Sequence, residues 1–169
     1  TSHRNIISQR GYTVAGGFKH ELDLMDSDGA DNSAGEMLLP MSADTQNGIA
    51  PHFPNAVVGA HMANYDFMVN LAHFKGHQMG GFGGVLKNQS IGMSARRGKA
   101  LIHSAGRNEV SSRWMQYADD QDGFLESMAE VANAIHQYFH QEGKNIIYID
   151  VMNKISVDCD CNGYPAAPV

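Results

Sequence analysis

The feature that most constrains the fold is a long amphipathic segment followed at once by a short apolar run. From Asp122 to Gln141, apolar residues recur at steps of three and four, the spacing of one face of a helix. Asp122 is a suitable N-terminal cap, and Gly143 is a natural end. The following run, NIIYIDVM over 145–152, has the length and composition of a strand. A helix, a tight turn and an apolar strand form the second half of a βαβ unit.

Two earlier runs, NAVVGAHM (55–62) and FMVNLAHF (67–74), also have strand length. Apolar runs without alternation are typical of strands covered on both faces, as in a parallel sheet. We therefore expect an α/β fold, a mainly parallel sheet flanked by helices, within a single domain over 55–169. A homo-oligomeric partner or the missing remainder of a longer chain would complete this sheet.

Residues 1–54 are predicted to form an irregular, gapped N-terminal segment. A short helix is expected within residues 1–16, ended by Gly11. Residues 17–54 are rich in Gly, Asp, Asn, Ser and Pro and show little periodicity, so they are predicted to be loop.

Composition excludes several classes of protein. The chain has 169 residues, enough for one domain with a proper core. No run approaches the roughly 18 apolar residues of a membrane span, so no membrane partner is expected. The formal net charge of −6 argues against nucleic-acid binding. With only two cysteines a disulfide framework is not expected, and reduced thiols favour a cytoplasmic setting.

Charge is distributed unevenly along the chain. Residues 67–108 contain six of the twelve Lys and Arg residues and none of the eighteen Asp and Glu residues. The rest of the chain therefore has six cations and all eighteen acids. A positive segment inside an acidic protein predicts a small anionic ligand.

The glycine-rich centre of this segment is the predicted anion site. Glycines let the backbone approach a ligand closely, and lysines supply point charges that suit phosphate or carboxylate. The run GGFGG over 80–84 matches neither the dinucleotide fingerprint nor the phosphate loop. The alternative is a flexible turn between elements, with solvated lysines around it. The predicted ligand-binding residues are Lys75, Gly80, Gly81, Gly83, Gly84, Lys87, Asn88 and Arg97.

Histidines supply the predicted catalytic groups. His77, between Gly76 and the glycine run, is predicted to act in acid–base catalysis or as a metal ligand, with His103 supporting it. A hydrogen-bonded structural role is the commoner one for any single histidine. His73 and His77 do not form the HExxH zinc motif, because no Glu follows His73.

A second chemically equipped segment follows the last predicted strand. Cys159 and Cys161 could bind a soft divalent metal together with His77, since thiolate and imidazole suit such ions. The alternative is a turn in which the cysteines act as small buried hydrophobes. If the two strands are parallel, residues 73–103 and 158–161 should face one crevice at the carboxyl ends of the strands. The cofactor itself is unknown.

Three stretches, HFKGHQMGGFGGVLKNQSIGM, RRGKALIHS and VMNKISVDCDCNGYPAAP, resemble the uncharacterised iron–sulfur-centre protein family, domain of unknown function 362. The resemblance extends over roughly Val57–Val169 and more faintly over the opening residues. Members are about twice as long, which implies that this chain is a fragment. The family motif is matched at Lys75, His77, Lys87, Asn88 and His103.

Many of these relatives carry a ferredoxin-like CxxCxxCxxxCP module after the position that matches His103. This chain has no such cysteines there, so no iron–sulfur cluster is expected in it. We therefore expect an enzyme or cofactor-handling domain that binds a small phosphate- or carboxylate-bearing ligand, with a redox or metal link. The alternatives are a noncatalytic metal-binding module built on His and Cys, and a scaffold domain that docks an acidic protein.

Overall fold

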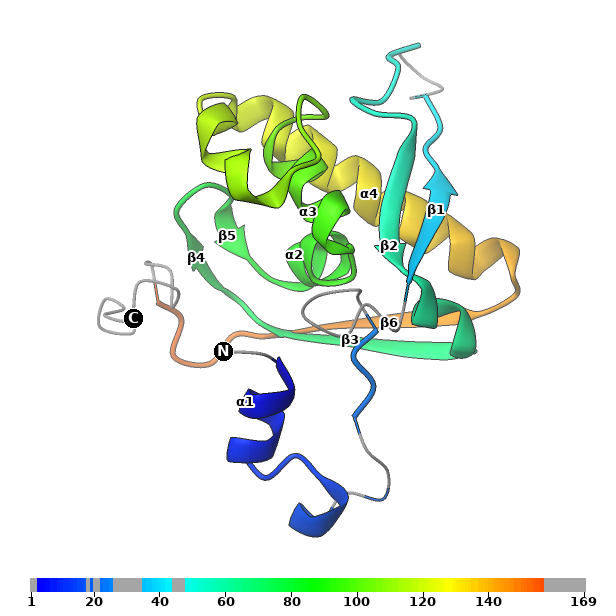
Figure 1. Ribbon diagram of the computed structural model, residues 1–169, viewed down its shortest axis with the longest axis vertical. Coiled ribbons are helices and arrows are strands. Elements are labelled where there is room, and N and C mark those ends of the chain that lie inside the picture. The colour runs from blue at the N-terminus through cyan, green and yellow to red at the C-terminus, as the bar shows by residue number, and fades with distance from the viewer. Residues whose placement is uncertain (1–2, 18, 20–21, 26–34, 44–47, 157–169) are drawn as a thin grey trace.

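The computed structural model describes residues 3–17, 19, 22–25, 35–43 and 48–156 of the chain. The α/β fold in a single domain is confirmed (Figure 1). In chain order the elements are helix α1 (His3–Gln9), the 3-10 turn η1 (Val14–Gly16), strands β1 (Glu36–Pro40) and β2 (Asn55–Gly59), the 3-10 turn η2 (Ala60–Asn64), strands β3 (Phe67–His73), β4 (Lys75–His77) and β5 (Gly81–Gly83), helix α2 (Val85–Lys87), the π-helical turn η3 (Asn88–Gly92), helix α3 (Arg96–His103), the 3-10 turn η4 (Ser111–Tyr117), helix α4 (Gln121–Gln141) and strand β6 (Asn145–Val151).

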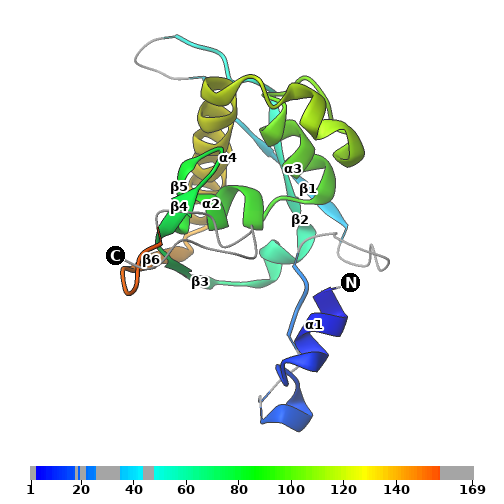
Figure 2. The ribbon, with the colours of Figure 1, turned by 90° about the vertical axis from the view of Figure 1, so that its left-hand side faces the viewer.

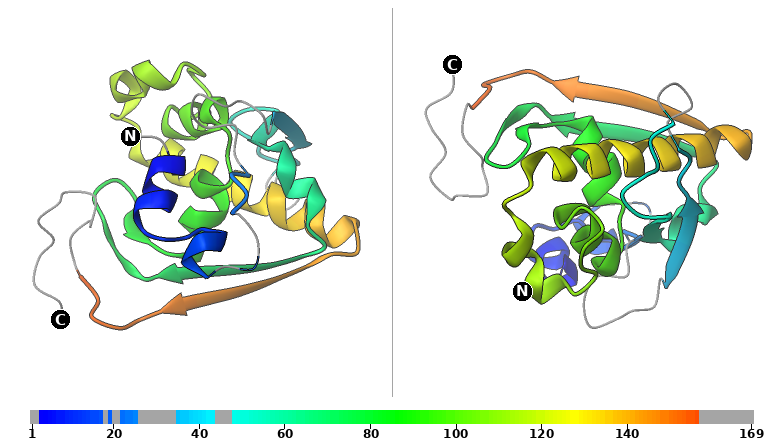
Figure 3. Two further views of the ribbon diagram at one scale, coloured as in Figure 1. Left: turned by 60° about the horizontal axis from the view of Figure 1, so that its bottom comes forward. Right: turned by 90° about the horizontal axis from the view of Figure 1, so that it is seen from above.

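The predicted parallel pairing is confirmed. β3 and β6 pair in parallel over seven residues each, from Phe67 opposite Asn145 to His73 opposite Val151. α4 precedes β6 and lies alongside the pair, as a βαβ connection requires (Figure 3). The strands consequently end at the same edge, where β4 begins two residues after β3 ends.

The core forms around the predicted apolar stripe of α4. Phe124, Met128, Val131, Ile135 and Phe139 are all 3% exposed or less. Burial of each such side chain stabilises the fold by roughly 1.5–3 kcal/mol. The cap lies two positions before the expected one, because the carboxylate of Asp120, not that of Asp122, accepts the backbone N–H of Gly123 at 2.9 Å.

Among the described residues, helices cover only one face of the β3–β6 pair, so the prediction of strands covered on both faces is wrong within this part of the chain. Helices α2, α3 and α4 all lie on the same side of the pair (Figures 1 and 3). Because side chains alternate between faces, one set faces these helices and includes buried Asn70 and Ala72. The side chains on the opposite face are exposed. Six of them are apolar and 42–59% exposed: Phe67, Val69, Leu71, Ile147, Ile149 and Val151.

Two antiparallel pairs complete the strands. β1 pairs with β2, although residues 17–54 were predicted to be loop; this prediction is wrong at Glu36–Pro40. The expected strand over 55–62 ends at Gly59, and its last residues belong to the 3-10 turn η2. β4 and β5 form a short hairpin. Within the described residues, no helix has the length and apolar character needed to cross a membrane.

Candidate functional site

The β4–β5 hairpin positions the predicted anion-binding segment. The hairpin leaves the carboxyl end of β3 and returns along itself, with Lys75 opposite Gly83 and His77 opposite Gly81. Gly81 has φ +71°, a left-handed conformation that favours glycine, so the return depends on this residue type. β5 leads into α2, which ends with Lys87 beside the hairpin (Figure 2).

Lys75 and Lys87 pack against the same face of Gly83. A Cβ atom placed on Gly83 would lie 3.7 Å from Cγ and Cε of Lys75 and 3.7 Å from Cδ of Lys87. The two lysine stems, 12 positions apart in sequence, therefore lie close together over a residue that has no side chain. This is the convergence that the sequence predicted for these two residues.

Asp150 lies on the other face of the same glycine segment. A Cβ atom on Gly84 would lie 2.8 Å from Oδ1 of Asp150. Gly84 is extended, so its Cβ direction is opposite to that of its neighbour Gly83. The backbone therefore separates the two lysines from this carboxylate.

Two backbone donors around the glycine run already have partners within the chain. The N–H of Val85 donates to Oδ1 of Asp150 at 3.0 Å, so a carboxylate of the protein itself occupies the start of α2. The N–H of Gly80 donates to Nδ1 of His77 at 2.9 Å. The glycines therefore contribute to the site mainly because they have no side chains, and the lysines contribute its positive charge.

His77 lies within reach of three cationic or titratable groups. Its pKa is lowered from 6.5 to about 4, most strongly by burial and then by Lys87, Lys75 and His103, in that order of strength. The imidazole is therefore neutral at pH 7. The lowered pKa of His77 also reflects the charges of Lys75 and Lys87. The three residues selected from the sequence therefore lie close enough to interact.

His103 lies at the carboxyl end of α3. Burial lowers its pKa, the hydrogen bond to the carbonyl of Lys99 opposes this, and the charges of Lys87 and Lys99 lower it again. The Nδ1–H group donates to that carbonyl at 2.6 Å, and the ring packs at 5.2 Å against Phe124. His103 is therefore held in place by this hydrogen bond and by the core residue Phe124, and its role toward the site is a supporting one.

Asn88 and Arg97, also predicted to bind the ligand, have partners elsewhere. Nδ2 of Asn88 donates to the carbonyl of Leu71 at 3.3 Å, which ties the residue to β3. Arg97 forms ion pairs with Glu36 at 3.0 Å and Glu109 at 2.9 Å, and these hydrogen bonds raise its pKa. Their role in ligand binding stays a prediction.

The carboxyl ends of β3 and β6 meet as expected. Nε2 of His73 contacts the carbonyl of Asn153 at 2.6 Å, and the N–H of Gly76 donates to the carbonyl of Ser156 at 2.7 Å. Cys159 and Cys161, the predicted metal ligands, lie outside the described residues. Among those that the structure does describe, no group of three His, Cys, Asp or Glu side chains could hold a metal ion.

A family model, the domain of unknown function DUF362, matches residues 3–169. The chain belongs to this family. The resemblance seen in the glycine-rich and carboxyl-terminal stretches is thereby confirmed over nearly the whole sequence. Neither the curated proteins nor the solved structures include a match to this DUF362 chain.

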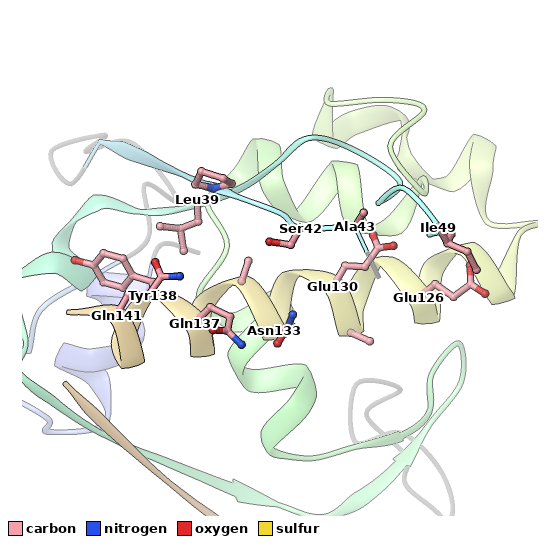
Figure 4. A pocket seen from close by; sticks show the side chains of 13 residues that line it. Leu39, Ser42, Ala43, Ile49, Glu126, Glu130, Asn133, Gln137, Tyr138 and Gln141 are labelled. Atoms are coloured by element: carbon pink, nitrogen blue, oxygen red, sulfur yellow. The ribbon is translucent and has the colours of Figure 1, made fainter. Parts of the chain in front are cut away.

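The DUF362 chain also has a groove that its sequence did not indicate. About 900 Å³ in volume, it lies between α4 and the chain that continues from β1, and Figure 4 shows Glu126 and Glu130 along its floor. His52 contacts both carboxylates, Glu130 at 3.1 Å and Glu126 at 3.3 Å. The described residues that line this groove include two glutamates and no Lys or Arg, so it does not suit an anion. No sequence signal predicts it, because His52 and Glu130 are 78 positions apart.

Proposed function

We propose that this chain binds a small oxyanion, phosphate- or carboxylate-bearing, on the face of the glycine segment that carries Lys75 and Lys87. The ligand would belong to a substrate or a cofactor, so the chain would serve as an enzyme or a cofactor-handling domain. The observation that carries the proposal is the packing of both lysine stems against Gly83, next to neutral His77.

The energetics of this cluster support the proposal. Lys87 and Lys75 both lower the pKa of His77, so the positive charges of the two lysines act at the same ring. A bound anion would counter this effect on the ring, and perturbed titratable groups of this kind gather at functional sites.

The shape of the segment supports the same proposal. Gly83 has no side chain between the two lysines, so an oxyanion can approach the backbone there. The carboxylate of Asp150 is on the opposite face and accepts the N–H of Val85, so this negative charge is directed away from the lysine face.

A metal or redox link depends on Cys159 and Cys161, which lie outside the described residues. A cytoplasmic setting depends on the scarcity of cysteines, since reduced thiols are usual there.

Calorimetric titration with phosphate, sulfate and a dicarboxylate tests the proposal. We expect saturable binding of at least one of these anions, lost or weakened about tenfold in Lys75→Ala and in Lys87→Ala. Arg96→Ala is the matched control, because Arg96 is an exposed cation of the same acid-free segment. Equal weakening in all three variants would indicate attraction by net charge alone and would refute the assigned site.

A further inference from the structure

The hydrogen bond between Gly80 and His77 determines the tautomer of the imidazole. A backbone N–H can only donate, so Nδ1 of His77 must present its lone pair to Gly80, 2.9 Å away. The proton of the neutral ring is therefore on Nε2. A doubly protonated ring would set one N–H against another and lose this bond.

The surroundings of His77 favour the same neutral form. Lys87 on α2, Lys75 on its own strand and His103 on α3 are the charged or titratable groups that act on it, and each disfavours an imidazolium. Burial acts in the same direction. The hydrogen bond and the electrostatics thus agree on a ring that donates through Nε2 and accepts through Nδ1.

We infer that His77 is a fixed hydrogen-bond donor of the anion site, acting through Nε2–H, and that the site selects oxyanions that carry no proton, such as the phosphate dianion and sulfate. This inference rests on the proposed function. Lys75 and Lys87 can also only donate, so the three side chains together offer donors and no acceptor. An oxyanion that keeps a proton would find no partner for it among these three side chains, and an unpaired donor is costly.

Among the described side chains, Asp150 and His103 supply acceptors close to this cluster. Asp150 is on the opposite face of the glycine segment, with Oδ1 bound to the N–H of Val85. His103 uses its Nδ1–H for the carbonyl of Lys99, so a neutral His103 has an acceptor at Nε2. Reception of a ligand proton by His103 is therefore the outcome that would contradict the selection.

The tautomer is measured on the ligand-free protein. In the nitrogen-15 spectrum of the imidazole rings between pH 5 and pH 8, we expect His77 to show a proton on Nε2 and none on Nδ1. A proton on Nδ1, or a doubly protonated ring in this range, would overturn the inference. Because no anion is present, this result is independent of whether the proposed function is correct.

Selection is measured by titrating sulfate and inorganic phosphate in parallel from pH 5 to pH 8. Sulfate stays a dianion throughout, whereas phosphate takes up a proton as the pH falls through its second ionisation. We expect constant sulfate affinity and about a tenfold loss of phosphate affinity toward pH 5. Flat affinity for both anions would show that an acceptor such as His103 receives the proton, and would overturn the selection while leaving the anion site in place.

Two variants of His77 test its donor role. His77→Gln keeps an amide N–H near the position of Nε2, whereas His77→Leu fills similar space without a donor. We expect sulfate affinity to fall about tenfold in His77→Leu and to be largely kept in His77→Gln. Equal losses, with unchanged thermal stability, would overturn the donor role. If sulfate and phosphate both fail to bind the parent protein, it is the proposed function that fails.

Discussion

Two partly buried histidines of this protein have opposite surroundings. His52 lies between the carboxylates of Glu126 and Glu130, and its own backbone N–H also donates to Glu130 at 3.1 Å. His77 lies among Lys75, Lys87 and His103, with one ring nitrogen bound to a backbone N–H. The first ring has its charge partners within the chain, whereas the second is surrounded by groups that disfavour its charge.

This difference distinguishes the cluster around His52, which is structural, from the surroundings of His77, which form the candidate site. At His52, the ring and the backbone N–H both contact glutamates of α4, and the cluster ties the segment after β1 to α4 without a ligand. Around His77, like charges gather at an electrostatic cost that a bound anion would offset. The groove beside α4 is therefore not the better candidate for an anion, because Glu126 and Glu130 line it.

The strongest test of this contrast removes the charges on each side. In the double variant Lys75→Ala/Lys87→Ala, we expect anion affinity to fall at least about a hundredfold, since each charge-assisted contact contributes roughly 1.5–3 kcal/mol. In Glu126→Gln/Glu130→Gln, the affinity measured by the same calorimetric titration should stay within about twofold. Comparable losses in the two double variants would remove the distinction.

A second test compares the two rings in stability. His52→Ala deletes the side-chain bonds to both glutamates and should lower the free energy of unfolding by roughly 1–3 kcal/mol. His77→Leu should cost less, because that ring has one hydrogen bond to a backbone group. Urea unfolding measures both, and a larger loss for His77→Leu would mean that His77 is the structural residue of the two.

A third test uses neighbouring glycines. Gly84→Ala would bring a Cβ to 2.8 Å from Oδ1 of Asp150, displace this carboxylate from the N–H of Val85 and cost about 1–2 kcal/mol of stability. Gly83→Ala meets only lysine methylenes at ordinary contact distance and should change stability little. Thermal unfolding of both variants decides, and equal losses would argue against the separation of the two faces.

The pH dependence of His77 is a fourth test. Its folded-state pKa, about 4, is below the unfolded value of 6.5, so the unfolded chain binds the proton more readily. His77 should therefore favour the folded state above pH 6.5 and lose this contribution as the pH falls from 6.5 through about 4. In Lys87→Met the pKa, followed by NMR titration, should rise toward 6.5. An unchanged pKa would show that Lys87 does not act on the ring.

The smallest effect is expected at Arg97, a cation of the same acid-free segment that has partners. Arg97→Ala should lower stability by at most about 1 kcal/mol, because its pairs with Glu36 and Glu109 are half-exposed. Anion affinity should not change. A tenfold loss of anion affinity in this variant would mean that Arg97 does belong to the site, as the sequence had predicted.

Periodicity made much of the fold predictable. The apolar stripe of α4 and the compact apolar runs of β3 and β6 are local patterns, and their parallel pairing follows from the helix between them. β1 was missed because Glu36–Pro40 becomes a strand only by pairing with β2. The open face of β3 and β6 was missed because apolar content does not tell which face the helices cover.

The candidate site was predictable only in part. The absence of acids and the glycine run singled out Lys75, His77 and Lys87, which do come together. Charge counting also overestimated the free positive charge, since carboxylates from other segments pair with Arg97 and with Arg107, the latter through Asp119 at 3.3 Å. The bond from Gly80 to His77 depends on turn geometry that no residue pattern specifies.

The measurement that tests the central claim most directly is a sulfate titration of the protein, with the imidazole signals of His52 and His77 followed in one NMR experiment. We predict a saturable change in the signals of His77, none at His52, and loss of the change in Lys87→Ala. A response at His52, or a response at His77 that persists in Lys87→Ala, would contradict the assignment of the anion site to the lysine face of the glycine segment.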